Sequence, residues 1–115
     1  ILNFIHDPDP ALRAAGAGDS WAHSSGFEAI HSGMSLYTSR SNANPRGGRH
    51  FVVESVHDRI PHDLKAASIV TKNFPEKAEV LRQKFRIRED SERLLFALQR
   101  GTGGAKSYIV ARRIR

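Results

Sequence analysis

Apolar and polar residues alternate along the last third of the chain, and this period of two predicts β-strands. The alternation runs through residues 84–89, 93–99 and 106–114. Turn-forming residues at 90–92 and the glycine-rich segment 101–104 separate these three runs. Since each run follows the previous one after a short turn, the pattern predicts an antiparallel meander of three strands.

Capping residues and helical spacing predict short helices before this meander. Asp9 followed by Pro10 is a helix start, because proline fits the first helical position. Ser25 and Glu28 have the spacing of a capping box, and the segment 73–76 carries a similar cap signature. We therefore expect helices over residues 10–15, 25–32, 61–72 and 73–83.

Residues 50–56 carry apolar side chains on both faces of an extended segment, which is typical of a central strand. A further strand is expected over 35–40, and the segment 41–49, rich in Asn, Gly and Pro, is expected to be a loop. The predicted fold class is therefore α+β: short N-terminal helices packed on a small antiparallel sheet, which consists of the three-strand C-terminal meander plus the strand near 50–56. Residues 1–115 have the length of a single domain.

Positive charge is concentrated in the later part of the sequence. The net charge is +6, but residues 1–39 carry −3 and residues 40–115 carry +9. Arginine predominates near the end of the chain, and its planar fork can bind phosphate through two hydrogen bonds. This asymmetry favours RNA as the partner over an acidic protein or a membrane surface. The arginines predicted to bind nucleic acid are Arg46, Arg49, Arg86, Arg88, Arg112 and Arg113.

The composition excludes several classes of site. The sequence has no cysteine, which excludes disulfides, thiolate zinc sites and cysteine nucleophiles. No apolar run has the roughly 20 residues that a membrane span requires, and no signal peptide is visible. The chain opens on Ile1 rather than Met, so we expect a piece of a longer protein. No metal site and no cofactor is predicted.

Histidine supplies the candidate acid–base chemistry. The chain has six histidines, and imidazole exchanges protons near neutral pH. His50 follows a Gly-Gly-Arg loop and shares strand parity with Glu54, which could orient it; His57 closes the same predicted strand. In the last strand Lys106 and Tyr108 would project from one face, where they could hold a phosphate and stack a base or move a proton. The predicted catalytic residues are therefore His50, His57, Tyr108 and Lys106.

Each of these residues also has a structural interpretation. A single histidine is more often a surface or capping residue than a catalyst, and Tyr108 suits a half-buried position in a strand. Three His-Asp dipeptides occur, at 6–7, 57–58 and 62–63, but adjacent side chains diverge and do not chelate a metal by themselves. The segment 101–106 lacks the strand-to-helix context of a phosphate-binding loop.

A capped helix followed by KFRIRED (84–90), RLLFALQR (93–100) and KSYIVARRIR (106–115) forms a recognisable arrangement over residues 62–115. This arrangement resembles the helix-and-sheet core of RelE-type toxins and, more broadly, the barnase, EndoU and colicin group of ribonucleases. The resemblance implies an antiparallel sheet that holds RNA on one face and metal-independent cleavage. It also implies that the chain is the C-terminal toxin piece of a large secreted bacterial protein.

Together these features predict a metal-independent endoribonuclease of the bacterial toxin type that cleaves RNA, tRNA among the candidate substrates. An acidic cognate immunity or antitoxin protein is the expected partner. The expected location is either secretion within a larger protein, to act in a target-cell cytoplasm, or the cytoplasm itself. Two alternatives stay open, a non-catalytic basic module that binds RNA or DNA and an interaction domain for an acidic protein. The sequence does not decide whether the chain is an enzyme.

Overall fold

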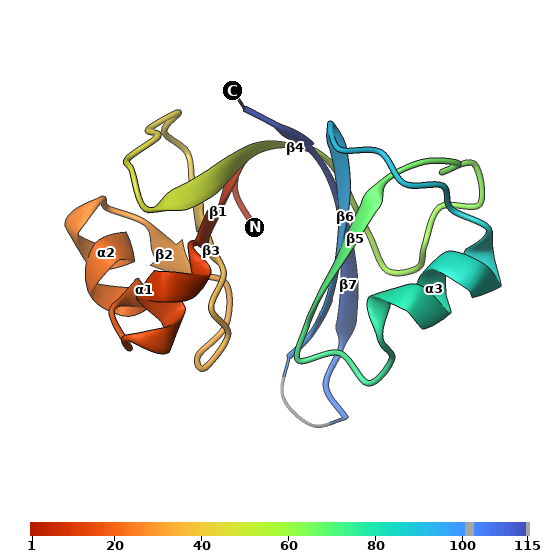
Figure 1. The fold of residues 1–115 in the computed structure, drawn as a ribbon, viewed down its shortest axis with the longest axis horizontal. Helices are drawn as coiled ribbons and strands as arrows, with labels where there is room; N and C mark the ends of the chain where they lie inside the picture. Colours follow the sequence, from red (N-terminus) through yellow and green to blue (C-terminus); the bar gives the residue numbers. More distant parts are fainter. Residues whose placement is uncertain (101–102, 115) are drawn as a thin grey trace. The chain divides into compact units, whose positions relative to one another are not determined.

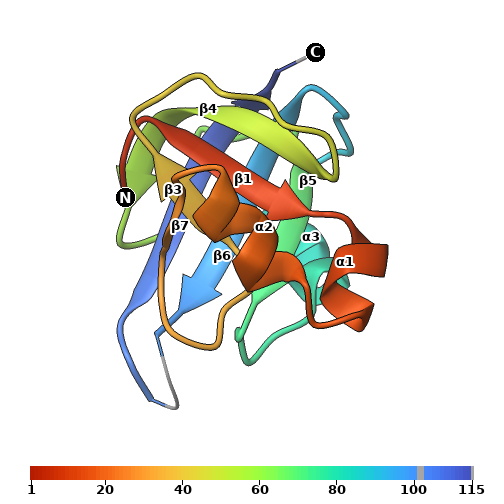
Figure 2. The same cartoon turned by 90° about the vertical axis from the view of Figure 1, so that its left-hand side faces the viewer.

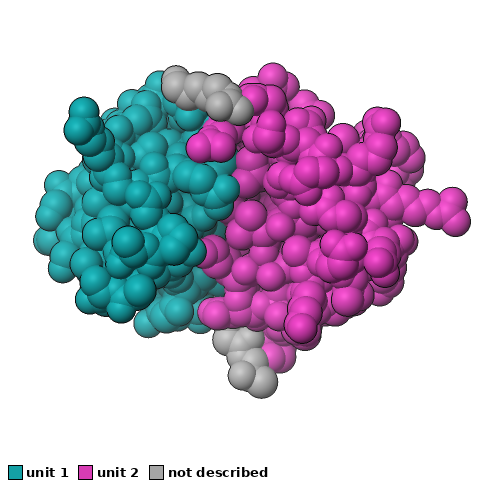
Figure 3. All heavy atoms as spheres, viewed as in Figure 1, with its two compact units in different colours: residues 1–53, 114–115 teal, residues 54–113 magenta. Residues whose placement is uncertain are grey.

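The computed structural model of the chain describes residues 1–100 and 103–114. The chain folds into two compact units, Ile1–Val53 with Ile114–Arg115 and Glu54–Arg113 (Figure 3). Strand β4 (Gly48–His57) begins in the first unit and ends in the second. The prediction of one domain over residues 1–115 is not tested by this division and stays a prediction.

The sheet is larger than the sequence predicted. Within the described residues, seven strands form one mixed sheet in the order β2-β3-β1-β4-β7-β6-β5. The α+β class is confirmed, but the expected three-strand meander plus one strand was an undercount. The elements in chain order (Figure 1) are β1 (Phe4–Pro8), α1 (Pro10–Ala14), α2 (Gly18–Ser24), β2 (Glu28–Ala29), β3 (Tyr37–Ser39), β4 (Gly48–His57), β5 (Ser68–Lys72), α3 (Ala78–Phe85), β6 (Arg93–Gln99) and β7 (Lys106–Arg113).

In the first unit, β1 lies between β3 and β4 and pairs antiparallel with both (Figure 2). Ile5 is opposite Thr38 on one side and Phe51 on the other, and its side chain is fully buried. Strand β1 was not predicted from the sequence. The strand expected over 35–40 is confirmed in its centre as β3.

A proline explains the start of one confirmed helix, and a serine hydroxyl explains why another predicted helix is wrong. Helix α1 begins at Pro10, directly after Asp9, as predicted. The helix expected over residues 25–32 is wrong, because Ser25 lies at the end of α2. Its hydroxyl donates to the backbone oxygen of Trp21 at 2.9 Å and so closes that helix. Glu28 then begins the short strand β2.

In the second unit, α3 lies beside the strands β5, β6 and β7 (Figure 1). Strands β6 and β7 form an antiparallel pair in which Leu95 is opposite Val110, while β5 runs parallel to β6. Leu81 of α3 and Ile87 belong to the same buried cluster as Leu95 and Val110. The strands predicted over 93–99 and 106–114 are confirmed. The predicted hairpin loop falls partly outside the described residues.

Two other predicted elements are wrong. The helix expected over residues 61–72 is replaced by irregular chain and by β5, whose β-branched residues favour an extended backbone. The strand expected over 84–89 is replaced by the last turn of α3, which ends where Arg86 adopts a left-handed backbone with φ 55°. Of that strand only an isolated bridge between Ala66 and Arg88 remains. The predicted meander is therefore a parallel strand followed by a hairpin.

Candidate nucleic-acid interface

A buried histidine pair of the first unit contains the predicted residue His50. Its Nδ1 lies 2.8 Å from Nδ1 of His6, and its Nε2 donates to the backbone oxygen of Pro45 at 2.8 Å. The ring of His6 stacks on Phe27 with 3.5 Å between centroids, and its Nε2 lies 2.7 Å from the Ser39 hydroxyl. Burial, followed by the charge of His50, lowers the pKa of His6 to about 4. His50 thus lies inside a buried hydrogen-bond network.

The other strand residues assigned to catalysis lie in the second unit. His57 places its Nε2 2.8 Å from the Ser55 hydroxyl. Glu54, expected to orient His50, binds two arginines described below. The catalytic roles predicted for both histidines are not tested and stay predictions.

Lys106 and Tyr108, both on β7, contact the same aromatic ring, that of Phe74. The Lys106 ammonium lies 5.3 Å from the centre of the Phe74 ring, and that ring packs edge-on against Tyr108 at 5.8 Å. Tyr108 is 9% exposed and belongs to the core of the second unit. Burial, with the Glu76 charge second, raises the pKa of its hydroxyl. Tyr108 thus has a packing contact in the core, and the catalytic roles predicted for Tyr108 and Lys106 are not tested and stay predictions.

Glu54 and two arginines form a charged row across the neighbouring strands β4, β7 and β6. Arg93 and Arg112 are directly opposite each other, a position in which like charges repel. The two carboxylate oxygens of Glu54 accept hydrogen bonds from the Nε atoms of these arginines, at 3.0 and 3.3 Å. One carboxylate thus compensates the repulsion, and the three side chains together keep a charge of +1.

This Glu54–arginine row leaves the outer edges of both guanidinium groups available. The ion pairs use the Nε atoms, and within the described residues the Nη groups of Arg93 and Arg112 make no hydrogen bond. The two side chains are 39% and 55% exposed. A guanidinium held in place by a carboxylate loses little further entropy when it binds an anion. The row therefore carries exposed hydrogen-bond donors of the kind that phosphate oxygens accept from.

A pocket of about 220 Å³ in the second unit includes one end of the row. Arg93 lines it together with His57, whose ring can donate or accept a proton. Asp63 adds a negative charge to the same wall, which restricts where an anion can bind. The remaining lining residues are Ser55, Pro61, Leu64 and Val110.

Three further exposed basic residues lie close together in the second unit. The backbone nitrogen of Arg88 donates to the backbone oxygen of Lys65 at 2.9 Å, so their two chain segments are neighbours. Arg86 precedes Arg88 by two residues, and all three side chains are exposed. Within the described residues none of the three forms an ion pair, whereas Arg82 pairs with Glu89 at 2.7 Å. Within the described residues, the positive charges of these three side chains are therefore not compensated by a carboxylate.

The other predicted arginines have different surroundings. Arg49 pairs with Asp7 at 2.8 Å, and Arg112 belongs to the row. Arg46 accepts a hydrogen bond on its backbone oxygen from Trp21, and the backbone nitrogen of Arg113 donates to Glu92. Arg93 and Lys65 were not among the residues predicted to bind nucleic acid. Whether each predicted arginine binds nucleic acid is not tested by these contacts and stays a prediction.

The two units differ in charge. Residues 54–113 contain thirteen Lys and Arg against eight Asp and Glu, a net charge of +5. The rest of the chain has five against four, a net of +1. Among the described residues, no group of three or more His, Asp or Glu side chains could hold a metal ion. None of the described helices has the length and apolar character to cross a membrane.

Comparison with known proteins identifies a different family from the one the sequence resembled. A family model described as THUMP domain-like matches residues 48–113. A solved structure from Porphyromonas gingivalis W83, of a protein to which methyltransferase activity is ascribed, matches the chain with a TM-score of 0.86 and 29% sequence identity. The match covers 100% of this chain and 30% of that one. No curated protein matches the sequence.

These findings correct the predicted function. The resemblance to RelE-, barnase-, EndoU- and colicin-type ribonucleases is wrong, and so is the toxin endoribonuclease inferred from it. A cognate immunity protein has no support. The resemblance required three consecutive antiparallel strands. In the structure, residues 84–89 include the end of a helix, and the neighbour of β6 on the side away from β7 is the parallel strand β5. The alternative of a basic module that binds RNA agrees better with the comparisons.

Proposed function

The chain belongs to the THUMP domain-like family, and from this membership we propose that it is an RNA-binding module that serves tRNA modification. The matched residues 48–113 contain the Glu54–arginine row and the exposed bases Lys65, Arg86 and Arg88. In this proposal the module binds and positions the RNA, and the chain's own histidines do not cleave it.

The Glu54–arginine row is the observation that carries this proposal. Phosphate contacts from Arg and Lys supply most of the affinity for RNA and fix how it is oriented. Two arginines fixed on one carboxylate present their Nη groups together, which suits the oxygens of a phosphodiester. The net charge of +5 on residues 54–113 would attract the RNA backbone to the same unit.

The similar solved structure suggests where the chemistry takes place. That protein is ascribed methyltransferase activity, and this chain covers 30% of its length. We therefore propose that the module works within a longer protein, in which another part transfers the methyl group to the bound RNA. Because such an RNA is a cellular tRNA, we propose the cytoplasm as the location.

Binding of labelled tRNA, measured by fluorescence anisotropy over a series of salt concentrations, tests the proposal. Arg112→Gln is expected to weaken binding about tenfold, because one charge-assisted contact to phosphate is lost. Arg112→Lys keeps the charge but not the fork, so an intermediate affinity is expected. The tRNA should stay full length on a gel, with or without EDTA.

Glu54→Gln separates a binding role of the row from a structural one. This substitution raises the local charge without removing an arginine, so RNA affinity should hold or rise while thermal stability falls. If the wild-type chain does not bind tRNA, or if Arg112→Gln binds it as tightly as the wild type, the proposed role of the row is wrong.

A further inference from the structure

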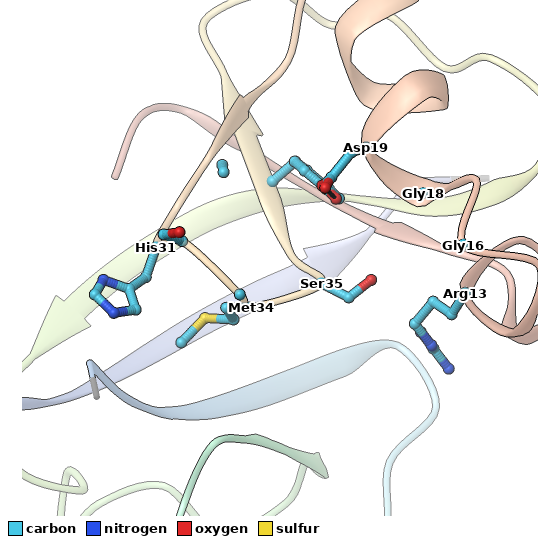
Figure 4. A pocket seen from close by; sticks show the side chains of 11 residues that line it. Arg13, Gly16, Gly18, Asp19, His31, Met34 and Ser35 are labelled. Atoms are coloured by element: carbon cyan, nitrogen blue, oxygen red, sulfur yellow. Dashed lines mark hydrogen bonds between the residues drawn. The ribbon is translucent and has the colours of Figure 1, made fainter. Parts of the chain in front are cut away.

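A larger pocket, of about 490 Å³, opens in the first unit (Figure 4). Its walls come from the segments 13–19 and 29–37. This size lies within the range of roughly 300–1,000 Å³ that is usual for small-ligand sites, and one nucleotide fits within it. The pocket lies outside residues 48–113, so neither the matched family nor the Glu54–arginine row accounts for it.

Arg13 gives this pocket a fixed positive group. Its Nη1 donates to Asp7 at 2.9 Å and to the backbone oxygen of Pro8 at 2.8 Å. The buried Asp7 also binds Arg49 at 2.8 Å, so one carboxylate holds two arginines and leaves a net charge of +1. Within the described residues, Nε and Nη2 of Arg13 make no hydrogen bond. This free edge of an immobilised guanidinium suits a phosphate.

Asp19 gives the pocket a fixed acceptor. The Tyr37 hydroxyl donates to one oxygen of Asp19. Burial first, and then the hydrogen bond and the charge of Asp19, raise the pKa of Tyr37 to about 12, so the tyrosine stays protonated and remains a donor. The second carboxylate oxygen makes no hydrogen bond in the described part of the chain. It can accept one from a sugar hydroxyl.

His31 completes the lining on the other side of the pocket. Figure 4 shows its ring and the Arg13 side chain at opposite sides, with Met34 and Ser35 between them. Imidazole rings stack on unpaired nucleobases, as other aromatic side chains do. The pocket thus offers a cation, an acceptor and a flat ring, the three kinds of group that can bind the phosphate, the ribose and the base of a nucleotide.

We propose that this pocket binds one unpaired ribonucleotide of RNA, with Arg13 on the phosphate, Asp19 on the ribose 2′-hydroxyl and His31 against the base. The inference rests on the proposed function, because the nucleotide belongs to the RNA that the module binds. It adds a prediction which charge alone does not make. The chain should distinguish RNA from DNA, since only RNA has the 2′-hydroxyl that would donate a hydrogen bond to Asp19.

NMR titration of the ¹⁵N-labelled chain tests the inference. The probes are a short unstructured single-stranded RNA, the DNA of the same sequence, and adenosine monophosphate. The RNA is expected to shift the backbone amides of Gly16, Gly18 and Gly33, which line the pocket. The DNA should bind about tenfold more weakly, because one charge-assisted hydrogen bond is missing.

Asp19→Asn is the informative variant. Its oxygen can still accept from Tyr37, but the NH₂ group that then faces the ligand cannot accept from a hydroxyl. The preference for RNA over DNA should be lost, while the affinity for DNA holds or rises, because one negative charge is removed beside the ligand. Asp9→Asn is the matched control, because it removes the same charge from an exposed acid that does not line the pocket, and the preference for RNA should persist.

The outcomes separate this inference from the proposed function. RNA binding without shifts at the pocket glycines, or an unchanged RNA preference in Asp19→Asn, overturns the pocket and leaves the proposed function intact. Shifts caused by adenosine monophosphate but not by the RNA mean that the pocket takes a free nucleotide, which also overturns the inference. No RNA binding at all overturns the proposed function, and the pocket proposal with it.

Discussion

At the scale of single residues, the buried His6–His50 pair has more hydrogen-bond contacts than protons. Four contacts link His6 to His50, His6 to Ser39, Ser39 to the Ser41 carbonyl, and His50 to the Pro45 carbonyl. Two neutral imidazoles and one hydroxyl supply three protons. When both rings are neutral, Ser39 therefore donates either to His6 or to Ser41. The network lies in a buried region, where an unsatisfied acceptor destabilises the fold.

This histidine pair predicts a loss of stability in mild acid. The folded pKa of His6 is about 4 and its ordinary value is 6.5, so between these values the unfolded chain binds more protons. The full stabilisation is present above pH 6.5 and is lost as the pH falls towards 4. The free energy of unfolding should drop by about 3 kcal/mol over this window from His6 alone. Urea unfolding at a series of pH values measures it.

A pair of histidine variants isolates the contribution of His6. His6→Gln should flatten the pH dependence between 6.5 and 4, whatever it does to stability at pH 7. His23→Gln changes an exposed histidine and should leave the wild-type slope in place. Equal slopes in the wild type and in His6→Gln would show that the buried pair does not govern acid stability.

At the scale of helices and strands, the sequence contained part of the candidate interface. The alternation over 93–99 and 106–114 with a glycine-rich loop between them predicts a hairpin, and that hairpin places Arg93 opposite Arg112. The role of Glu54 could not be predicted in the same way. It requires β4 to lie beside β7, and these strands are far apart in the sequence.

The wrong elements have local causes. Ser25 and Glu28 satisfy the spacing of a capping box, but a serine hydroxyl can also bond backwards to a helix carbonyl, as Ser25 does to Trp21. Residues 61–72 combine helix formers with a β-branched run, and pairing with β6 decides for the strand. Strand β1 contains His6, Asp7 and Pro8. The sequence pattern of these residues does not predict a strand, because Asp and Pro are uncommon in strands and the neighbours that pair with β1 are not known from the sequence.

The start of β4 gives a prediction at the scale of elements. A Cβ atom on Gly48 would lie 2.7 Å from Trp21 and 2.8 Å from the backbone oxygen of Asp7. Asp7 is paired to β4 and cannot move away easily. Gly48→Ala should therefore lower the free energy of unfolding by about 1–3 kcal/mol, measured by urea denaturation.

Gly18→Ala provides the comparison, because its new Cβ would meet neighbours at 3.5–3.6 Å, an ordinary contact distance. We expect its stability to stay within about 0.5 kcal/mol of the wild type, as is usual for substitutions that disturb no packing. Similar losses in both variants would mean that the approach of Trp21 to β4 is not the cause.

At the scale of the whole molecule, the net charge favours the proposed RNA partner, whereas the toxin endoribonuclease predicted from the histidines and the resemblance was wrong. The net charge is a sum over many residues, so errors in single elements leave it unchanged. Catalysis depends on a few side chains meeting within hydrogen-bond reach. The predicted pair His50 and His57 makes its hydrogen bonds to other groups in the described structure, to His6 and Pro45 and to Ser55. The charge therefore supports the proposed binding module, and the catalytic roles of His50 and His57 stay predictions.

The uneven charge of the two units predicts which arginines govern RNA binding. The double substitution Arg86→Gln and Arg88→Gln removes two exposed cations from residues 54–113, where the net charge is +5. The double substitution Arg40→Gln and Arg46→Gln removes the same charge from exposed positions of the other unit. The plot of log K against log salt concentration has a negative slope. If the first pair contacts phosphate, the magnitude of this slope should decrease by about 1.4–1.8, since each lost phosphate contact contributes about 0.7–0.9. The second pair should change the slope by less. Titrations of tRNA at several salt concentrations give both slopes, and equal changes would mean that RNA responds to the total charge and not to the basic surface of residues 54–113.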